Sequence, residues 1–129
     1  MDDGLVQQYY TIIRDKIAHF NFESAIRSAD KIISYRENDD GAYYYKGVCC
    51  FALEKYQDAI NFFKKALELN PGFGKAYFNL GATYHVLNKY DTALINIGKA
   101  LIIFARDKEL DCKDRCMQAL QLIQDERRA

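Results

Sequence analysis

The chain has 129 residues, about the size of a single domain, and half of them are apolar. Its 18 basic residues balance its 18 acidic ones, so no net field draws the protein to nucleic acid or to an anionic membrane surface. One proline and seven glycines are too few for a disordered or collagen-like chain. We therefore expect one folded domain without a nucleic-acid partner.

The N-terminal stretch MDDGLVQQYYTIIRDK carries acids where a secretory signal needs bases. The most apolar window, ALINIGKALIIFA, is too short to cross a bilayer and has Lys99 at its centre, so no membrane insertion is expected. The four cysteines include the adjacent pair Cys49 and Cys50, which favours free buried thiols in a reducing compartment over disulfides. These features predict a cytoplasmic protein.

The pattern of apolar residues predicts an all-α chain. Asp40 and Gly41 supply the chemistry of a helix start, and the run from Asn70 through Pro71 to Gly72 supplies a stop. A last segment, over about 108–126, is predicted to be an amphipathic capping helix with its apolar residues on one face: Leu110, Met117, Leu120 and Ile123. The six helices expected before it span about 4–18, 22–36, 41–54, 57–69, 75–88 and 91–105.

The sequence repeats itself at a constant offset of 34 residues. Residues 42–71 align with residues 76–105 without a gap. The matched pairs include Ala42 with Ala76, Tyr43 with Tyr77, Gly47 with Gly81, Leu53 with Leu87 and Ala59 with Ala93. The same frame carried back another 34 residues aligns Tyr9, Phe22, Ala25 and Ile26 with the later units, with Ile13 at the glycine position.

These units resemble the tetratricopeptide repeat, in which an aromatic residue, Leu-Gly, Tyr, Ala, Phe and Pro recur at fixed spacing. The matching residues are Tyr43, Gly47, Ala59, Phe63 and Pro71 in one unit, and Tyr77, Leu80, Gly81, Tyr84 and Ala93 in the next. The departures are Lys46, Cys50, Ile97 and Ala105. The resemblance implies a right-handed α-solenoid of antiparallel helical hairpins, with about seven helices in one domain over 1–129. Its repeats would span about 6–39, which is degenerate, 40–73 and 74–107, followed by the cap.

The small residues of each unit are expected where the two helices of a hairpin cross closely. These residues are Gly47 and Ala59 in one unit and Gly81 and Ala93 in the next. A larger side chain there should destabilise the fold by about 1–3 kcal/mol through overpacking.

The resemblance implies that the first helix of each hairpin lines a concave groove, which would be the functional surface. Because the expected groove face is rich in aromatic residues, we interpret it as the docking site of an apolar or amphipathic peptide segment. This makes the protein a non-enzymatic scaffold, adaptor or chaperone, although any single tyrosine on a helix is more often a core residue. The groove residues expected are Tyr10, Arg14, Tyr44, Tyr45, Val48, Phe51, Lys75, Phe78, Asn79 and His85.

Some members of the family clamp the C-terminal carboxylate of heat-shock chaperones with Lys, Asn, Asn, Lys and Arg. Laid over this sequence, those positions hold Tyr10, Arg14, Tyr45, Lys75 and Asn79, of which Lys75 alone matches. We therefore do not favour the carboxylate clamp, because an anionic terminus needs paired donors. The architecture is also similar to that of bacterial secretion chaperones that hold translocator segments, without a motif that singles them out.

Two other classes of function are alternatives to peptide binding. Catalysis would have to use Cys49, Cys50, Cys112 or Cys116 with His19 or His85, and no phosphate loop, nucleophile elbow or paired-carboxylate motif accompanies them. Cys112 and Cys116 lack a second ligand pair with zinc-like spacing, so we expect no metal and no cofactor. The remaining alternative is a homodimer, formed through the same rings or through the C-terminal helix.

Overall fold

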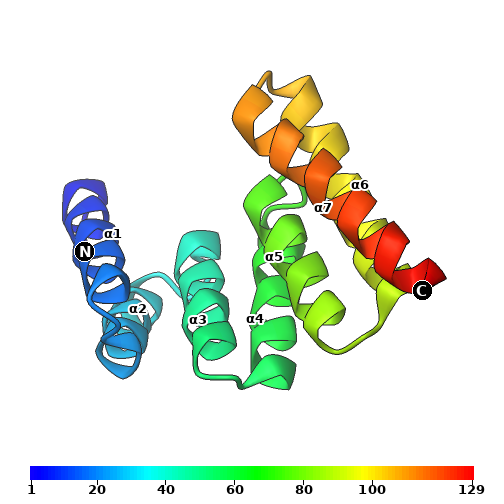
Figure 1. Cartoon of the computed structure of the whole chain (residues 1–129). Coiled ribbons are helices and arrows are strands. Elements are labelled where there is room, and N and C mark those ends of the chain that lie inside the picture. The colour runs from blue at the N-terminus through cyan, green and yellow to red at the C-terminus, as the bar shows by residue number, and fades with distance from the viewer. The chain divides into compact units, whose positions relative to one another are not determined.

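The structure, a computed structural model, describes residues 1–129 as seven helices (Figure 1). The all-α fold class and the number of helices agree with the sequence prediction, and each helix lies within two residues of its predicted bounds. The helices are α1 (Asp3–Ala18), α2 (Phe22–Tyr35), α3 (Asp40–Ala52), α4 (Tyr56–Leu69), α5 (Gly74–Val86), α6 (Tyr90–Arg106) and α7 (Leu110–Arg128). None of the seven helices combines the length and the hydropathy that a membrane-spanning segment requires.

The chain forms two compact units, Met1–Asn70 and Pro71–Ala129. In the first unit, α1 packs against α2, α2 against α3, and α3 against α4. In the second unit, α6 packs against both α5 and α7. The boundary falls at the predicted stop signal, close to the predicted border between the second and third repeats.

Side chains and special backbone conformations define the helix ends. The carboxylate of Asp2 caps α1 by accepting a hydrogen bond from the backbone N–H of Leu5 at 2.8 Å, and Asp39 caps α3 through Ala42 at 2.9 Å. The turn within each hairpin contains one residue in the left-handed conformation, and these residues follow each other at the 34-residue period. They are Phe20, Glu54 and Asn88, with φ of 61°, 61° and 60°.

The close helix crossing predicted at Gly47 is present in the first unit. A Cβ atom added to Gly47 of α3 would lie 2.6 Å from a ring carbon of Phe63 in α4, and Phe63 is fully buried. In the first repeat the same position holds Ile13, which is also fully buried. At Gly47, the space between the crossing helices is filled by a large side chain of the facing helix α4. In the first repeat, the equivalent space is filled by Ile13, a side chain of α1 itself.

The second unit contains the equivalent crossing of α5 and α6. A Cβ atom added to Gly81 would lie 2.5 Å from Cγ1 of Ile97 and 3.1 Å from the backbone oxygen of Ala93. Both Ile97 and Ala93 are buried. The expectation that small residues mark the crossings therefore holds in both intact repeats.

The C-terminal helix α7 packs against α6 through a stripe that includes two of the four predicted residues, Leu120 and Ile123. Cys116 and Ile123 are fully buried there, whereas Leu110 and Met117 remain 62% and 52% exposed, so the predicted apolar face is wrong at these two positions. The contacting stripe follows the helical period from Cys112 through Cys116 to Ile123, and the small cysteines had not been counted as apolar contacts. At the position equivalent to Gly47 and Gly81, α7 carries the bulky Arg115, which does not permit another close crossing.

Candidate functional site

Three tyrosines and an arginine of the predicted groove come together on α1 and α3, in a cluster that we call the aromatic patch: Tyr10, Arg14, Tyr44 and Tyr45. The ring centroids of Tyr10 and Tyr45 are 5.7 Å apart, and those of Tyr44 and Tyr45 are 5.3 Å apart in an edge-to-face arrangement. All three rings are partly buried. The rings of Tyr10 and Tyr45 pack on the core of the first unit, and each keeps some surface exposed to solvent.

Tyr10 is fixed in place by the start of α3. Its hydroxyl donates a hydrogen bond to the carboxylate of Asp39, the residue that caps α3. Gly41 leaves room for the ring, because a Cβ atom there would lie 2.6 Å from the Tyr10 hydroxyl oxygen. Burial, reinforced by the hydrogen bond to Asp39, raises the pKa of Tyr10 well above its usual value. The phenol therefore stays protonated and remains a donor to Asp39.

Arg14 provides the only cation of the aromatic patch. Its guanidinium donates to the Tyr45 hydroxyl at 3.1 Å and to the Thr11 hydroxyl at 3.3 Å, and the side chain is exposed. Both partners are neutral, so the positive charge is not compensated by a carboxylate. An acidic group on a ligand could pair with Arg14 without displacing an existing ion pair.

Val48 and Phe51, the other groove residues predicted on α3, lie beyond this cluster. Val48 is partly buried. The ring of Phe51 packs edge-on against Tyr56 at 5.6 Å, at the turn between α3 and α4. Tyr44 also packs against the interior, because its ring centroid lies 6.0 Å from that of the buried Phe63.

The groove residues predicted on α5 belong to the second unit and form a separate set. Lys75 is exposed, whereas Asn79 is partly buried. Phe78 packs against the core shared by α6 and α7. His85 faces α7, with Nε2 2.6 Å from a carboxylate oxygen of Glu126. The sequence did not predict this pairing, because 41 residues separate the two side chains.

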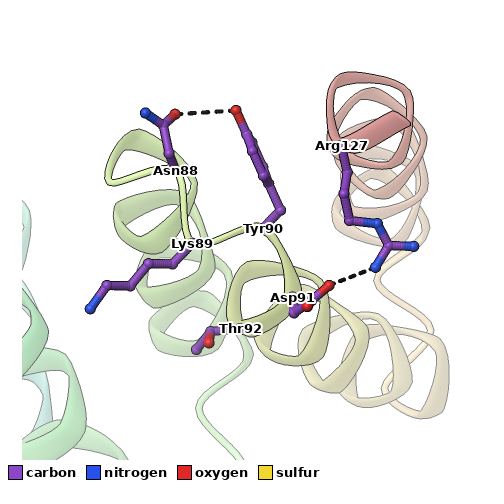
Figure 2. Close-up of a pocket in the computed structure, with 6 residues that line it drawn as sticks. All are labelled: Asn88, Lys89, Tyr90, Asp91, Thr92 and Arg127. Atoms are coloured by element: carbon purple, nitrogen blue, oxygen red, sulfur yellow. Dashed lines mark hydrogen bonds and ion pairs between the residues drawn. The ribbon is translucent and has the colours of Figure 1, made fainter. Parts of the chain in front are cut away.

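A shallow pocket of about 330 Å³ lies beside the start of α6 (Figure 2). Arg127 of α7 forms an ion pair with Asp91 at 2.6 Å, and the Tyr90 hydroxyl donates to the side chain of Asn88 at 3.2 Å. The pocket is lined by Asn88, Lys89, Tyr90, Asp91, Thr92 and Arg127. None of these residues was predicted to form a site, and the acidic side chain is already paired with the arginine.

All four cysteines are free thiols, and all except the partly buried Cys112 are buried. Burial raises the pKa of the Cys49 thiol to about 12 and that of Cys116 to about 11, and burial likewise raises the pKa of Cys50. Since the folded state disfavours these thiolates, their contribution to stability is complete below the ordinary thiol pKa of about 9. It is lost as the pH rises through the raised values.

Thiol labelling should therefore separate Cys112 from the other cysteines. At pH 8 we expect an aromatic disulfide reagent to modify Cys112 in the native protein on the order of 100-fold faster than the three buried thiols, which must wait for local opening. Unfolding in guanidinium should expose all four. The variant Cys112→Ser is the control and should lack the fast phase; a second fast thiol in that variant would contradict the burial of Cys49, Cys50 and Cys116.

Comparisons with known proteins agree with the repeat pattern. Two family models described as tetratricopeptide repeat match residues 41–73 and 62–95. The heat shock protein STI1 of Saccharomyces cerevisiae is 32% identical over 106 residues, which cover 78% of this chain and 18% of that protein. The chain thus spans about a fifth of the length of this curated relative.

Solved structures share the fold at low sequence identity. The type III secretion translocator chaperone SycD of Yersinia enterocolitica superposes with a TM-score of 0.89 at 15% identity, covering 100% of this chain and 90% of SycD. The first tetratricopeptide domain of Spaghetti (RPAP3), bound to the HSP90 peptide SRMEEVD, superposes with a TM-score of 0.83 at 18% identity, covering 100% of this chain and 98% of that one. Its internal period, its helical hairpins and these matches show that the chain belongs to the tetratricopeptide repeat family.

Proposed function

We propose that the chain is a non-enzymatic protein-interaction module that binds an apolar or amphipathic peptide segment on the aromatic patch. The observation that carries this proposal is the convergence of Tyr10, Tyr44 and Tyr45 from two helices on one partly exposed surface beside Arg14. Clustered tyrosines offer a large contact area at a low cost in side-chain entropy. Such a surface suits a ligand whose apolar side chains rest on the rings.

The aromatic patch is organised before any ligand arrives. Tyr10 is held by Asp39, and Tyr45 is held by Arg14 and by the rings on either side of it. A rigid surface loses little conformational entropy on binding, so more of the contact energy appears as affinity. The uncompensated charge of Arg14 favours segments with an acidic residue next to the apolar one.

The related structures support peptide binding as the general role. SycD is described as a translocator chaperone, and the Spaghetti domain was solved with a bound peptide. In both cases the ligand description belongs to those proteins, and the identities of 15% and 18% carry only the fold to this chain. The surface used by this chain is therefore argued from its own residues.

The proposal is tested by selecting ligands from a random peptide library and measuring their affinities by fluorescence anisotropy. We expect the selected peptides to combine apolar and acidic residues, and Tyr45→Ala to weaken them about tenfold or more, as truncation of a buried interface tyrosine does. The matched control is Tyr35→Ala, which removes a 58% exposed tyrosine from α2, outside the aromatic patch. Equal affinities of the two folded variants would place binding elsewhere.

The similarity to STI1 favours a second candidate ligand, the carboxylate terminus of a heat-shock chaperone. The aromatic patch is poorly suited to it, because Arg14 is its single cation, whereas a clamp on a terminal carboxylate needs several paired donors. The peptide SRMEEVD, with either a free or an amidated C-terminus, separates the two candidates. We expect amidation to change the affinity by less than about threefold, whereas a loss of tenfold or more would favour the clamp.

A further inference from the structure

Helix α6 has an apolar stripe on the side facing away from its own core. Ile95 and Ile102 are 59% and 68% exposed, and Gly98 lies between them at helical spacing. The buried apolar residues of α6 occupy the opposite side of the helix: Ala93, Ile97, Ala100 and Phe104. The stripe, defined as Ile95, Gly98 and Ile102, therefore contributes little to packing within the second unit.

The other two repeats show that the fold does not require apolar residues at these positions. The position of Ile95 is occupied by Arg27 in the first repeat and by Asn61 in the second. All the equivalent side chains on α2 and α4 are exposed and polar: Arg27, Asp30 and Ser34, then Asn61, Lys64 and Glu68. The third repeat alone replaces them with Ile, Gly and Ile. Exposed apolar residues that gather on one face of a helix, rather than lying singly, mark an interaction surface.

Gly98 gives the stripe a shape suited to another helix. A Cβ atom at Gly98 would meet nothing within 4 Å, in contrast to Gly81, which is crowded by Ile97. The absence of a side chain at Gly98 thus has no packing role inside the chain, although glycine weakens the middle of a helix. It leaves a depression between two isoleucines, into which the side chain of a second helix can fit.

We propose that the stripe is the interface with a second copy of this chain, in which the two α6 helices pack antiparallel about a two-fold axis between Gly98 and Lys99. In that register Ile95 of each copy lies opposite Ile102 of the other. Gly98 lies opposite Lys99, whose ammonium lies 5.6 Å from the ring centroid of Tyr77 in its own copy and whose long aliphatic stem can cover the depression. An isologous interface of this kind uses the same surface on both copies.

The charges at the two ends of the stripe favour a second copy of the chain as the partner, with its α6 helix antiparallel. The antiparallel register brings Asp91 of one copy opposite Arg106 of the other, and these side chains are 81% and 65% exposed. A parallel pair would instead place Asp91 beside Asp91 and Arg106 beside Arg106. Within one copy, Asp91 contacts Arg127 and Arg106 contacts Asp107, so the new pairs would extend existing ion pairs into a network.

Sedimentation velocity over a dilution series tests the proposal. We expect the wild-type chain to show a concentration-dependent dimer. The variant Ile95→Asn, Ile102→Glu carries the residues found in the second repeat, and it should raise the dimer dissociation constant at least about tenfold while circular dichroism shows unchanged helix content. The control is Leu122→Glu, which changes a residue of α7 that is 54% exposed and should leave the dissociation constant unchanged.

Charge reversal tests the register. Asp91→Arg and Arg106→Asp should each weaken the dimer, and the double variant Asp91→Arg, Arg106→Asp should restore it, although it still lacks the contact with Arg127. A wild-type chain that stays monomeric up to millimolar concentration would overturn the proposal. So would a dimer that survives substitution of both isoleucines, or one that is lost on substitution of the aromatic patch instead.

Discussion

Replacing Phe63 with alanine is expected to lower the free energy of unfolding of the first unit by about 3–5 kcal/mol. Phe63 is fully buried, and its ring fills the space left by Gly47 where α3 and α4 cross. Truncation removes the apolar contacts and leaves a cavity that the backbone of the crossing helices can close only in part. Urea unfolding followed by circular dichroism measures the loss.

The neighbouring residue provides the matched control. Phe62 is only partly buried, and its ring centroid lies 6.4 Å from that of Tyr43 and 4.4 Å from the ammonium of Lys46, both on α3. Phe62→Ala removes the same atoms from a site that water can partly refill, so it should cost clearly less than Phe63→Ala. Equal losses for the two variants would mean that α4 does not bury the face assigned to it.

The sequence was sufficient for most of the fold because the repeat supplies two independent copies of the same packing pattern. The glycine at positions 47 and 81 and the alanine at positions 59 and 93 could be recognised as a helix crossing only because they recur together. No such copy exists for α7. Its contacts with α6 run through Cys112 and Cys116 as well as through the predicted Leu120 and Ile123. The predicted Leu110 and Met117 stay exposed, because hydrophobicity alone does not decide which face of a helix packs.

The candidate site was predicted less completely, since a helical period gives the direction of a side chain but not its partner. The spacing predicted one surface for Tyr10, Arg14 and Tyr45, and in the structure Tyr45 contacts both of the other side chains. Two partners could not be foreseen. Asp39 binds Tyr10, and Glu126 binds His85, over separations of 29 and 41 residues that no local pattern encodes.

The two glycines of the second unit should respond in opposite ways to the same substitution. Gly81→Ala is expected to destabilise the protein by about 1–2 kcal/mol, because the new methyl group overlaps Ile97 and approaches the backbone of Ala93. Gly98→Ala should stabilise it by about 0.5–1 kcal/mol, since alanine favours the helix and meets nothing within 4 Å. Thermal and urea unfolding at low micromolar concentration, where self-association through α6 is minimal, measure both changes.

The comparison isolates the contribution of packing to the free energy of unfolding. Both glycines lie inside helices of one unit, and replacing either with alanine gains the same helix preference of about 1 kcal/mol. The difference between the variants is therefore the overpacking cost at the crossing of α5 and α6. The double variant Gly81→Ala, Ile97→Val should recover part of that cost, since valine lacks the Cδ1 methyl group that crowds Gly81 at 3.2 Å. If Gly81→Ala were as stable as Gly98→Ala, the two helices could not cross as closely as the structure shows.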